Sequence, residues 1–246
     1  MLIFFIGHWF SSLFVQTFFL HRFASHRMFK LSERWLKFWY VTTVILQGVS
    51  FLNPRAYAIL HRRHHAYSDG VLDPHSPMRH RNVFSLMRET YENYLTALSR
   101  NNKEFEKYGS NIPEWPWLDR LADQWSVRIG FVVVYTLIYI VFAPSIWWFL
   151  LLPIHFIMGP IHGAIVNWGG HKYGYVNHPD TGDHSRNTLP FDFLTLGELF
   201  QNNHHHSPGR LNFAHRWYEI DPVYWVIRLM AVIGLVQITD TKLKQI

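Results

Sequence analysis

Residues 2–20, LIFFIGHWFSSLFVQTFFL, contain no Asp, Glu, Lys or Arg. A helix of this length is long enough to cross the hydrocarbon core of a bilayer. A secretory signal peptide is the competing interpretation. However, no basic residues precede the run, and His21 and Arg22 stand where a small-residue cleavage site would be needed. The stretch therefore predicts a first membrane span.

Two further charge-free stretches predict a second and a third span, at residues 129–152 and 154–170. Only Pro153 separates them, which is typical of a helical hairpin that enters the membrane and returns. Residues 21–128, between the first and second spans, are rich in Arg and Lys. By the positive-inside rule this segment faces the cytoplasm, and Met1 lies on the far side.

Residues 35–52, WLKFWYVTTVILQGVSFL, are long enough to span a bilayer but contain Lys37, Gln47 and Gly48. A single crossing here would separate the histidines before this stretch from those after it, so that one metal centre could not use both. We therefore expect a helix that lies in the membrane interface or packs on other helices. Residues 223–236 are short and interrupted by Arg228, so we expect them to be interfacial too.

Together these patterns predict an all-α integral membrane protein. It would have three to four transmembrane helices and a cytoplasmic helical cap, in a single domain over residues 1–246. A length of 246 residues with 49% hydrophobic content fits one domain. The absence of cysteine excludes disulfides, thiolate zinc sites, cysteine-ligated iron–sulfur clusters and thiol catalysis. The net charge of +6 does not indicate nucleic acid, because the cations lie beside apolar spans and not in a basic stripe. An anionic membrane face explains them better.

Histidine is the informative residue type, with 17 copies concentrated in short stretches. His61, His64 and His65 stand at i, i+3 and i+4, which places three imidazoles on one helix face. Gln201, His204 and His205 repeat that spacing. His21 and His26 follow the first predicted span, and Asn167 and His171 form an i, i+4 pair at the end of the third. The candidate metal ligands are therefore His21, His26, His61, His64, His65, Asn167, His171, His204 and His205. A lone histidine is more often a packing or surface residue, but four such groups near span ends predict convergence on one site.

The ligand type limits the metal without naming it, because imidazole suits zinc, copper, iron and nickel. About eight nitrogen donors exceed the three that a catalytic zinc needs, and no HExxH motif is present. The Glu-x-x-His pairs of carboxylate-rich di-iron bundles are also absent. A histidine-rich dinuclear site at a membrane surface indicates oxygen activation on an apolar substrate.

At these residues the sequence resembles the membrane fatty acid desaturases, in particular the bacterial acyl-CoA desaturases of the stearoyl type. The resemblance rests on three histidine boxes, HRFASH at 21–26, HRRHH at 61–65 and QNNHH at 201–205, and on NWGGH at 167–171. The segments DPHS, HSRN and RWYEIDP extend it over residues 20–222. It implies that the histidines bind two iron ions directly and that Asn167 acts through a bound water.

The third box departs from the stearoyl-type pattern, which opens with histidine where this chain has Gln201. Other desaturase branches also have glutamine there, and His162 or His206 are alternative donors. Ile59 and Leu60 replace charged residues that lie near the CoA head group in stearoyl-type enzymes, so the acyl carrier stays open. Asp69, Asp73 and Glu198 either orient ligand imidazoles or are solvated and capping carboxylates. His8 and His155 either line an acyl tunnel or pack against neighbouring helices.

The function implied by the resemblance is oxygen-dependent desaturation of a long-chain fatty acyl-CoA or acyl lipid, with O2 as co-substrate and release of water. The sequence contains no redox module of its own, so we expect a separate electron donor, of ferredoxin or cytochrome type, with a reductase. The expected location is a bacterial inner membrane with the active site facing the cytoplasm. A hydroxylase or ketolase of the same histidine-box superfamily is the alternative enzyme. A non-enzymatic metal carrier would need polar and acidic residues inside the spans, and these are nearly absent.

Overall fold

The computed structural model describes residues 1–239, which are mostly helical. The elements in chain order are α1 (Leu2–Val15), η1 (Gln16–Ser25), β1 (Phe29–Lys30), α2 (Glu33–Gln47), η2 (Gly48–Ser50), α3 (Pro54–Tyr67), η3 (Pro77–Arg79), α4 (Val83–Ser99), α5 (Lys103–Glu106), α6 (Pro116–Ala122), α7 (Trp125–Phe142), η4 (Ile146–Leu151), α8 (Leu152–Phe156), α9 (Met158–Ala164), η5 (Ile165–Gly169), α10 (Gly170–Lys172), α11 (Gln201–His206), α12 (Pro222–Val232) and β2 (Gln237–Ile238). The two short strands pair antiparallel. The predicted single domain extends to Ile246, and its last seven residues, 240–246, lie outside the described part.

The first predicted span is a helix that is longer than the apolar run. α1 continues directly into the π-helix η1, so that Leu2–Ser25 forms 24 helical residues, long and apolar enough to cross a membrane. The additional turns carry His21 beyond the apolar stretch while keeping it on the same rigid element. The end of the span is thereby also one wall of the candidate site.

The second span starts and ends earlier than the apolar pattern predicted. α7 runs from Trp125 to Phe142 and exposes apolar side chains such as Ile140 and Val141, which are 63% and 68% exposed. It stops well before Leu152 because Pro144 disfavours helical dihedrals at the preceding residue, and Ala143 is extended, with φ −76° and ψ 123°. α7 is the second helix that is long and apolar enough to span.

The third predicted span, residues 154–170, is broken. The helical segments Ile146–Phe156 and Met158–Lys172 meet at an angle of 69°. Ile157 leaves the helical region, with φ −128° and ψ 23°. Pro160 has no N–H to donate to the carbonyl of Phe156, so a continuous α-helix could not pass through this point without losing a hydrogen bond. Residues 1–239 thus contain two helices able to cross a membrane, or three if the bent pair counts as one span.

The stretch predicted to be interfacial, residues 35–52, contains all but the first two residues of α2, and the short η2. Ser32 caps α2 by accepting a hydrogen bond from the Trp35 amide. The helix ends at Gly48, whose φ of +51° suits glycine, and a Cβ there would collide with the Tyr135 hydroxyl. α2 has 15 residues and is not among the candidate spans, and α12 is a shorter apolar helix. The position of both relative to a membrane stays a prediction.

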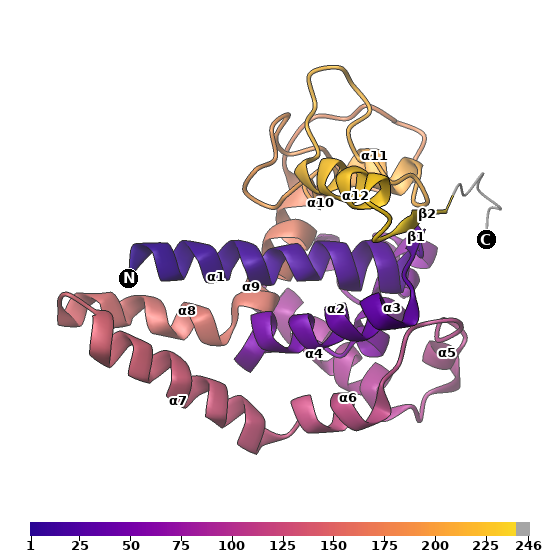
Figure 1. Cartoon of the computed structure of the whole chain (residues 1–246). Helices are drawn as coiled ribbons and strands as arrows, with labels where there is room; N and C mark the ends of the chain where they lie inside the picture. The colour runs from indigo at the N-terminus through magenta and orange to yellow at the C-terminus, as the bar shows by residue number, and fades with distance from the viewer. Residues whose placement is uncertain (240–246) are drawn as a thin grey trace.

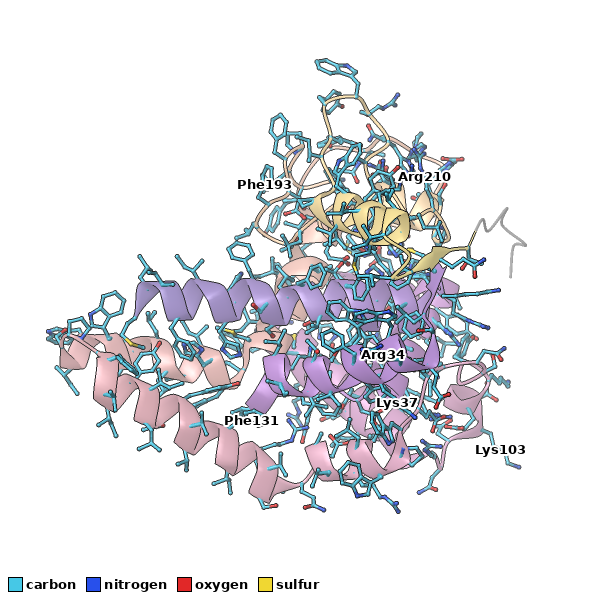
Figure 2. All side chains as sticks on the ribbon, viewed as in Figure 1. Arg34, Lys37, Lys103, Phe131, Phe193 and Arg210 are labelled. Carbon is cyan, nitrogen blue, oxygen red and sulfur yellow. The ribbon has the colours of Figure 1, made fainter. Side chains whose placement is uncertain are left out.

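The arrangement of the helices separates an apolar end from a basic end. In Figure 1, α1 runs through the middle of the molecule, with α10–α12 on one side of it and α2–α6 on the other. The hairpin of α7 and α8 extends toward the N-terminus. Figure 2 shows Arg34, Lys37 and Lys103 at the opposite end from that hairpin. This polarity is what a basic cap on a membrane-embedded base would produce.

The largest buried cluster lies where η1 meets residues 200–232, which contain α11 and α12 and are called the cap below. Phe18, Phe19 and Phe29 pack there with Phe200 and Phe213, all at most 1% exposed. Because Phe200 and Phe213 flank α11, the same core fixes the third histidine box against the first. The packing therefore positions the histidines from distant segments at one point.

Candidate metal centre

The first histidine box depends on the π-helical geometry of η1. His21 lies in η1 and His26 directly follows it, with the His26 amide hydrogen-bonded to the His21 carbonyl at 3.1 Å. An i→i+5 turn brings residues five apart to the same face, whereas an α-helix would rotate them apart. The two rings are accordingly 4.9 Å apart between centroids. This local geometry explains why a four-residue spacer can supply two donors to one site.

The second box lies on α3, which begins at Pro54 and is capped by the Asn53 side chain. The His61 and His65 Nε2 atoms are 3.0 Å apart on one face, as the i, i+4 spacing predicts. His64 points to the adjacent cluster described below. One helix therefore serves two groups of donors.

Five histidine side chains converge in a first cluster. The Nε2 atoms of neighbouring pairs are separated by 2.6 Å between His26 and His61, 2.9 Å between His65 and His204, and 3.1 Å between His21 and His204. One nitrogen from each of His21, His26, His61, His65 and His204 lies within 4.8 Å of all the others.

Three histidines form a second cluster beside the first. The Nε2 atoms of His64 and His205 are 3.1 Å apart. The Nε2 atom of His171 is buried without a hydrogen-bond partner. His64, His171 and His205 meet the same 4.8 Å criterion, and neighbouring rings of the two clusters, such as those of His65 and His205, are 4.6 Å apart between centroids. The arrangement provides two adjacent nitrogen-lined positions.

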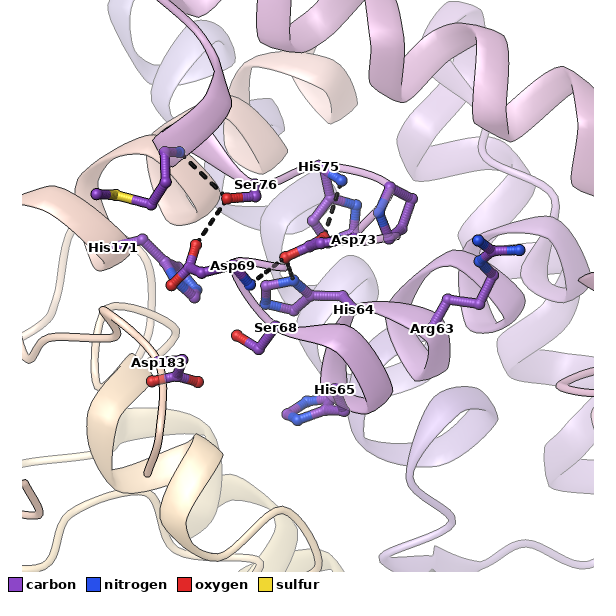
Figure 3. A network of polar contacts seen from close by, with 12 residues as sticks. Arg63, His64, His65, Ser68, Asp69, Asp73, His75, Ser76, His171 and Asp183 are labelled. Atoms are coloured by element: carbon purple, nitrogen blue, oxygen red, sulfur yellow. Dashed lines mark hydrogen bonds and ion pairs between the residues drawn. The ribbon is translucent and has the colours of Figure 1, made fainter. Parts of the chain in front are cut away.

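In four of these rings, a carboxylate lies beside Nδ1, the ring nitrogen that points away from the cluster. His21 Nδ1 lies 2.5 Å from Glu198, His64 Nδ1 lies 2.9 Å from Asp73 and His171 Nδ1 lies 2.9 Å from Asp69. Figure 3 shows Asp73 and Asp69 beside their histidines. The fourth carboxylate, Asp183, lies 2.5 Å from Nδ1 of His205. Because a carboxylate only accepts, Nδ1 donates the hydrogen in the bonds of His64, His171 and His205, and Nε2 of each ring is left to face the cluster.

Protonation in the clusters favours metal binding. Burial, together with the neighbouring imidazoles, holds the pKa of His26, His61, His65 and His204 well below the usual histidine value. Burial also lowers the pKa of His64, but Asp73 outweighs it and the net shift is upward. A neutral imidazole has a lone pair on one ring nitrogen, and a cation at the centre of the cluster would accept the lone pairs of several rings at once. The donor set therefore fits transition-metal ions.

The comparisons with known proteins agree with this geometry. The family model described as fatty acid desaturase matches residues 1–236. The chain belongs to the fatty acid desaturase family. An acyl-CoA 5-desaturase of Anemone leveillei is 30% identical over 94% of this chain and 68% of its own length. A Delta-9 desaturase-like protein of Arabidopsis thaliana is 28% identical over 92% of this chain and 72% of its own. An sn-1 stearoyl-lipid 9-desaturase of Anabaena variabilis is 27% identical over 90% and 78%.

A cavity of about 730 Å³ adjoins the histidine clusters of this desaturase. His21, His61 and Gln201 form part of its wall. Most other lining side chains are apolar or aromatic. They include Leu13 from α1, Leu60 from α3, Tyr94 from α4, Val132 from α7 and Val166 from η5. The volume lies within the usual range of small-ligand sites. An apolar cavity that ends at a cluster of metal donors suits an apolar substrate.

Two predicted polar residues of the desaturase site also line this cavity. Asn167 lies in η5, and Gln201 is the first residue of α11. The Gln201 amide nitrogen donates to the Glu198 carbonyl at 2.6 Å. Both residues are thus brought to the wall between cavity and clusters.

The alternative donors considered for the third box lie elsewhere. His162 is fully buried in α9, lines the cavity and has no partner on either ring nitrogen, but it belongs to neither histidine cluster. His206 points to the surface and contacts Asp180. His8 and His155 pack on each other, with their Nδ1 atoms 2.6 Å apart, and neither lines the cavity.

Sequence reasoning missed two residues of the site. Asp183 contacts His205 from a loop with no periodic pattern, so no spacing marked it. His75 was part of the quoted DPHS segment but was given no role. It is 5% exposed, has no partner on either ring nitrogen, and lies 4.5 Å from the His64 ring between centroids. Its backbone amide donates to Asp73, which explains why the DPH sequence holds Asp73 in place (Figure 3).

Proposed function

We propose that this desaturase introduces a double bond into a long-chain fatty acyl substrate, carried either by CoA or by a membrane lipid, in an oxygen-dependent reaction at two iron ions. The single observation that carries the proposal is the pair of adjacent histidine clusters at the end of an apolar cavity. Bound iron would supply the activation of O2 that unactivated methylene groups require.

Each of the two histidine clusters would bind one of the two ions. The first cluster offers His21, His26, His61, His65 and His204, and the second offers His64, His171 and His205 with Asn167 acting through water. Glu198, Asp73, Asp69 and Asp183 fix the ring orientations through the Nδ1 protons. Gln201 would contribute at most a weak amide oxygen.

The cavity would place the substrate. A saturated chain offers no polar handle near its reacting carbons, so only the shape of the surrounding wall selects which methylenes approach the ions. Leu13, Leu60 and Val166 supply apolar wall. No side chain is needed as a general base in this scheme.

The proposed setting is a bacterial inner membrane. Leu2–Ser25, Trp125–Phe142 and the bent pair would cross the bilayer, with α2 and α12 in its interface and the clusters on the cytoplasmic side. A separate redox protein of ferredoxin or cytochrome type, with its reductase, would deliver electrons.

Expression in a bacterial host, with ferredoxin and cytochrome donors supplied in turn, tests the function. We expect new unsaturated acyl chains in the host lipids, measured by mass spectrometry. The variant His171→Ala is the control and should yield none, because the second cluster loses one of its three imidazoles. Hydroxylated or keto products in place of unsaturated ones would contradict the proposal in favour of the alternative enzyme class.

A further inference from the structure

A third group of histidines lies on the surface of the cap, outside the two clusters described above. His178, His206 and His215 come from three separate segments of the chain. One donor atom from each of His178, Asp180 and His206 lies within 4.8 Å of the other two. Nδ1 of His215 is 2.8 Å from Nε2 of His178. Four side chains of metal-binding type therefore meet at one exposed point.

The separations within this group resemble those of metal ligands. In a tetrahedral site, donors about 2.0–2.1 Å from the ion lie roughly 3.4 Å from one another. Nδ1 of His206 and Oδ1 of Asp180 are 3.4 Å apart. His178 Nε2 and His215 Nδ1 are hydrogen-bonded to each other at 2.8 Å, so an ion bound by both rings would replace this bond. The rings of His178 and His206 are stacked, with centroids 3.8 Å apart and planes 6° from parallel, so one ring would have to turn for both to direct a nitrogen at one ion.

The backbone under the group is fixed before any ion binds. Oδ1 of the buried Asn202 accepts hydrogen bonds from the amides of Asn177 and His178, and the Asn202 Nδ2 donates to the His178 carbonyl. The His215 amide donates to Glu219 at 2.6 Å. His206 is held by α11. Prearrangement of this kind reduces the ordering that binding would otherwise require.

We propose that His178, Asp180 and His206, with His215 beside them, bind one divalent transition-metal ion of the zinc class. Three imidazoles and a carboxylate are donors that such ions accept. The ion would tie the loop that contains His178 and Asp180 to the C-terminal end of α11. Because His206 directly follows His204 and His205, it would also steady the third histidine box.

Zinc counting on the full-length protein in detergent tests the proposal. The protein is saturated with Zn²⁺ alone, freed of excess metal, and analysed for zinc per chain by mass spectrometry. We expect His206→Ala and Asp180→Ala each to hold one zinc fewer than the native chain. The matched control His184→Ala, an exposed histidine outside the group, should hold the native number.

The difference of one ion is diagnostic whatever the total, so the result does not depend on the proposed desaturase centre. If His206→Ala disturbed α11, Asp180→Ala decides, because the Asp180 side chain is 70% exposed and its removal should leave the fold intact. Equal zinc in the native chain and Asp180→Ala would overturn the site. Equal loss in His184→Ala would overturn it too, since the effect would then not be local.

Discussion

Gln201 occupies the position in the third box where an imidazole would be expected, yet contacts that need no metal hold it in place. Its amide nitrogen donates to the Glu198 carbonyl, and its side chain packs on Gly170 so closely that a Cβ there would lie 2.4 Å from the Gln201 Cγ. A glutamine offers only an amide oxygen, which is a weaker donor to iron than imidazole. The local contacts thus favour a positioning role.

The variant Gln201→Ala should therefore retain measurable desaturation and both metal ions, whereas His204→Ala should retain neither activity nor full metal content. Gln201→His should be tolerated, because an imidazole at this position would face the same site. Acyl-chain analysis and metal counting on the purified variants measure both effects. If Gln201→Ala were as inactive and metal-poor as His204→Ala, glutamine would have to be counted as an essential ligand.

Alanine at any one of the eight clustered histidines should abolish activity while the protein still inserts in the membrane. The eight are His21, His26, His61, His64, His65, His171, His204 and His205. Each change removes one nitrogen donor. The neighbouring side chains are held in place and cannot supply another donor at that position. His184→Ala is the control and should remain active. Normal activity in any two of the eight variants would mean that the ligand set is wrong.

Individual residues differ in how far the sequence could identify them. The i, i+3, i+4 spacing identified the α3 histidines, because helix geometry is local and fixes which side chains share a face. Asp183 reaches His205 across 22 residues of irregular chain, a pairing that only the folded cap determines. His75 was visible in the sequence, but its burial against His64 depends on the turn that follows α3. Local sequence patterns thus predicted the histidine donors. Most of the residues that contact their rings are brought there by the tertiary structure.

At the scale of elements, apolar runs located the spans but not their ends. η1 continues the first helix through Ser25, five residues past Leu20, where the uninterrupted apolar run ends, and nearly all of its side chains are buried. Pro144 and Pro160 break the later runs in ways that hydropathy ignores. The sequence had the prolines, and their effect on helix continuity could have been applied to residues 129–170.

The segment between the first two boxes should not cross the membrane. A single crossing would place about 30 Å of hydrocarbon between donors that lie together in the structure. The exposed positions Lys30 and Val71 lie on either side of this segment and are suitable labelling sites in this cysteine-free chain. The variants Lys30→Cys and Val71→Cys should react with an impermeant thiol reagent from the cytoplasmic side only.

Ser145→Cys provides the opposite control, because this exposed residue lies in the turn between α7 and η4 and should react only from the other side. Reaction of Lys30→Cys and Val71→Cys from different sides would reject both the topology and the shared metal centre.

A buried ion pair joins the first helix to the cap. Arg22 is fully buried, donates to both oxygens of Asp221 at 2.9 and 3.0 Å, and stacks on Phe213. Without Asp221, the buried Arg22 keeps only the more distant carboxylate of Glu198, 3.8 Å from its Nε, and breaking a buried pair typically costs about 3–5 kcal/mol. Asp221→Ala should therefore lower the thermal unfolding midpoint clearly. Glu33→Ala, which breaks the exposed pair with Lys37, should leave it nearly unchanged, and equal effects would contradict this account.

At the scale of the whole molecule, the histidine clusters act as a joint between the membrane helices and the cap. Their members come from η1, α3, α10 and α11, which lie far apart in the sequence. In the absence of a cation, the facing lone pairs of these buried imidazoles would repel one another. Binding of metal would therefore be coupled to the packing of these segments, since each brings the same four segments together.

That coupling predicts a metal content that can be assigned cluster by cluster. In a His206→Ala background, which removes the proposed surface ion, protein from iron-replete cells should hold about two ions per chain. Zinc can replace ferrous iron at such donors, so the total of both metals is the relevant count. Adding His171→Ala should reduce it to about one, because the second cluster then keeps two imidazoles while the first keeps all five. Adding His162→Ala should leave two ions, since His162 lies outside both clusters, although neither of its ring nitrogens has a hydrogen-bond partner.

Two results would reject the division into five and three donors. One is a native chain with a single tightly bound ion, and the other is the loss of an ion in the variant with His162→Ala.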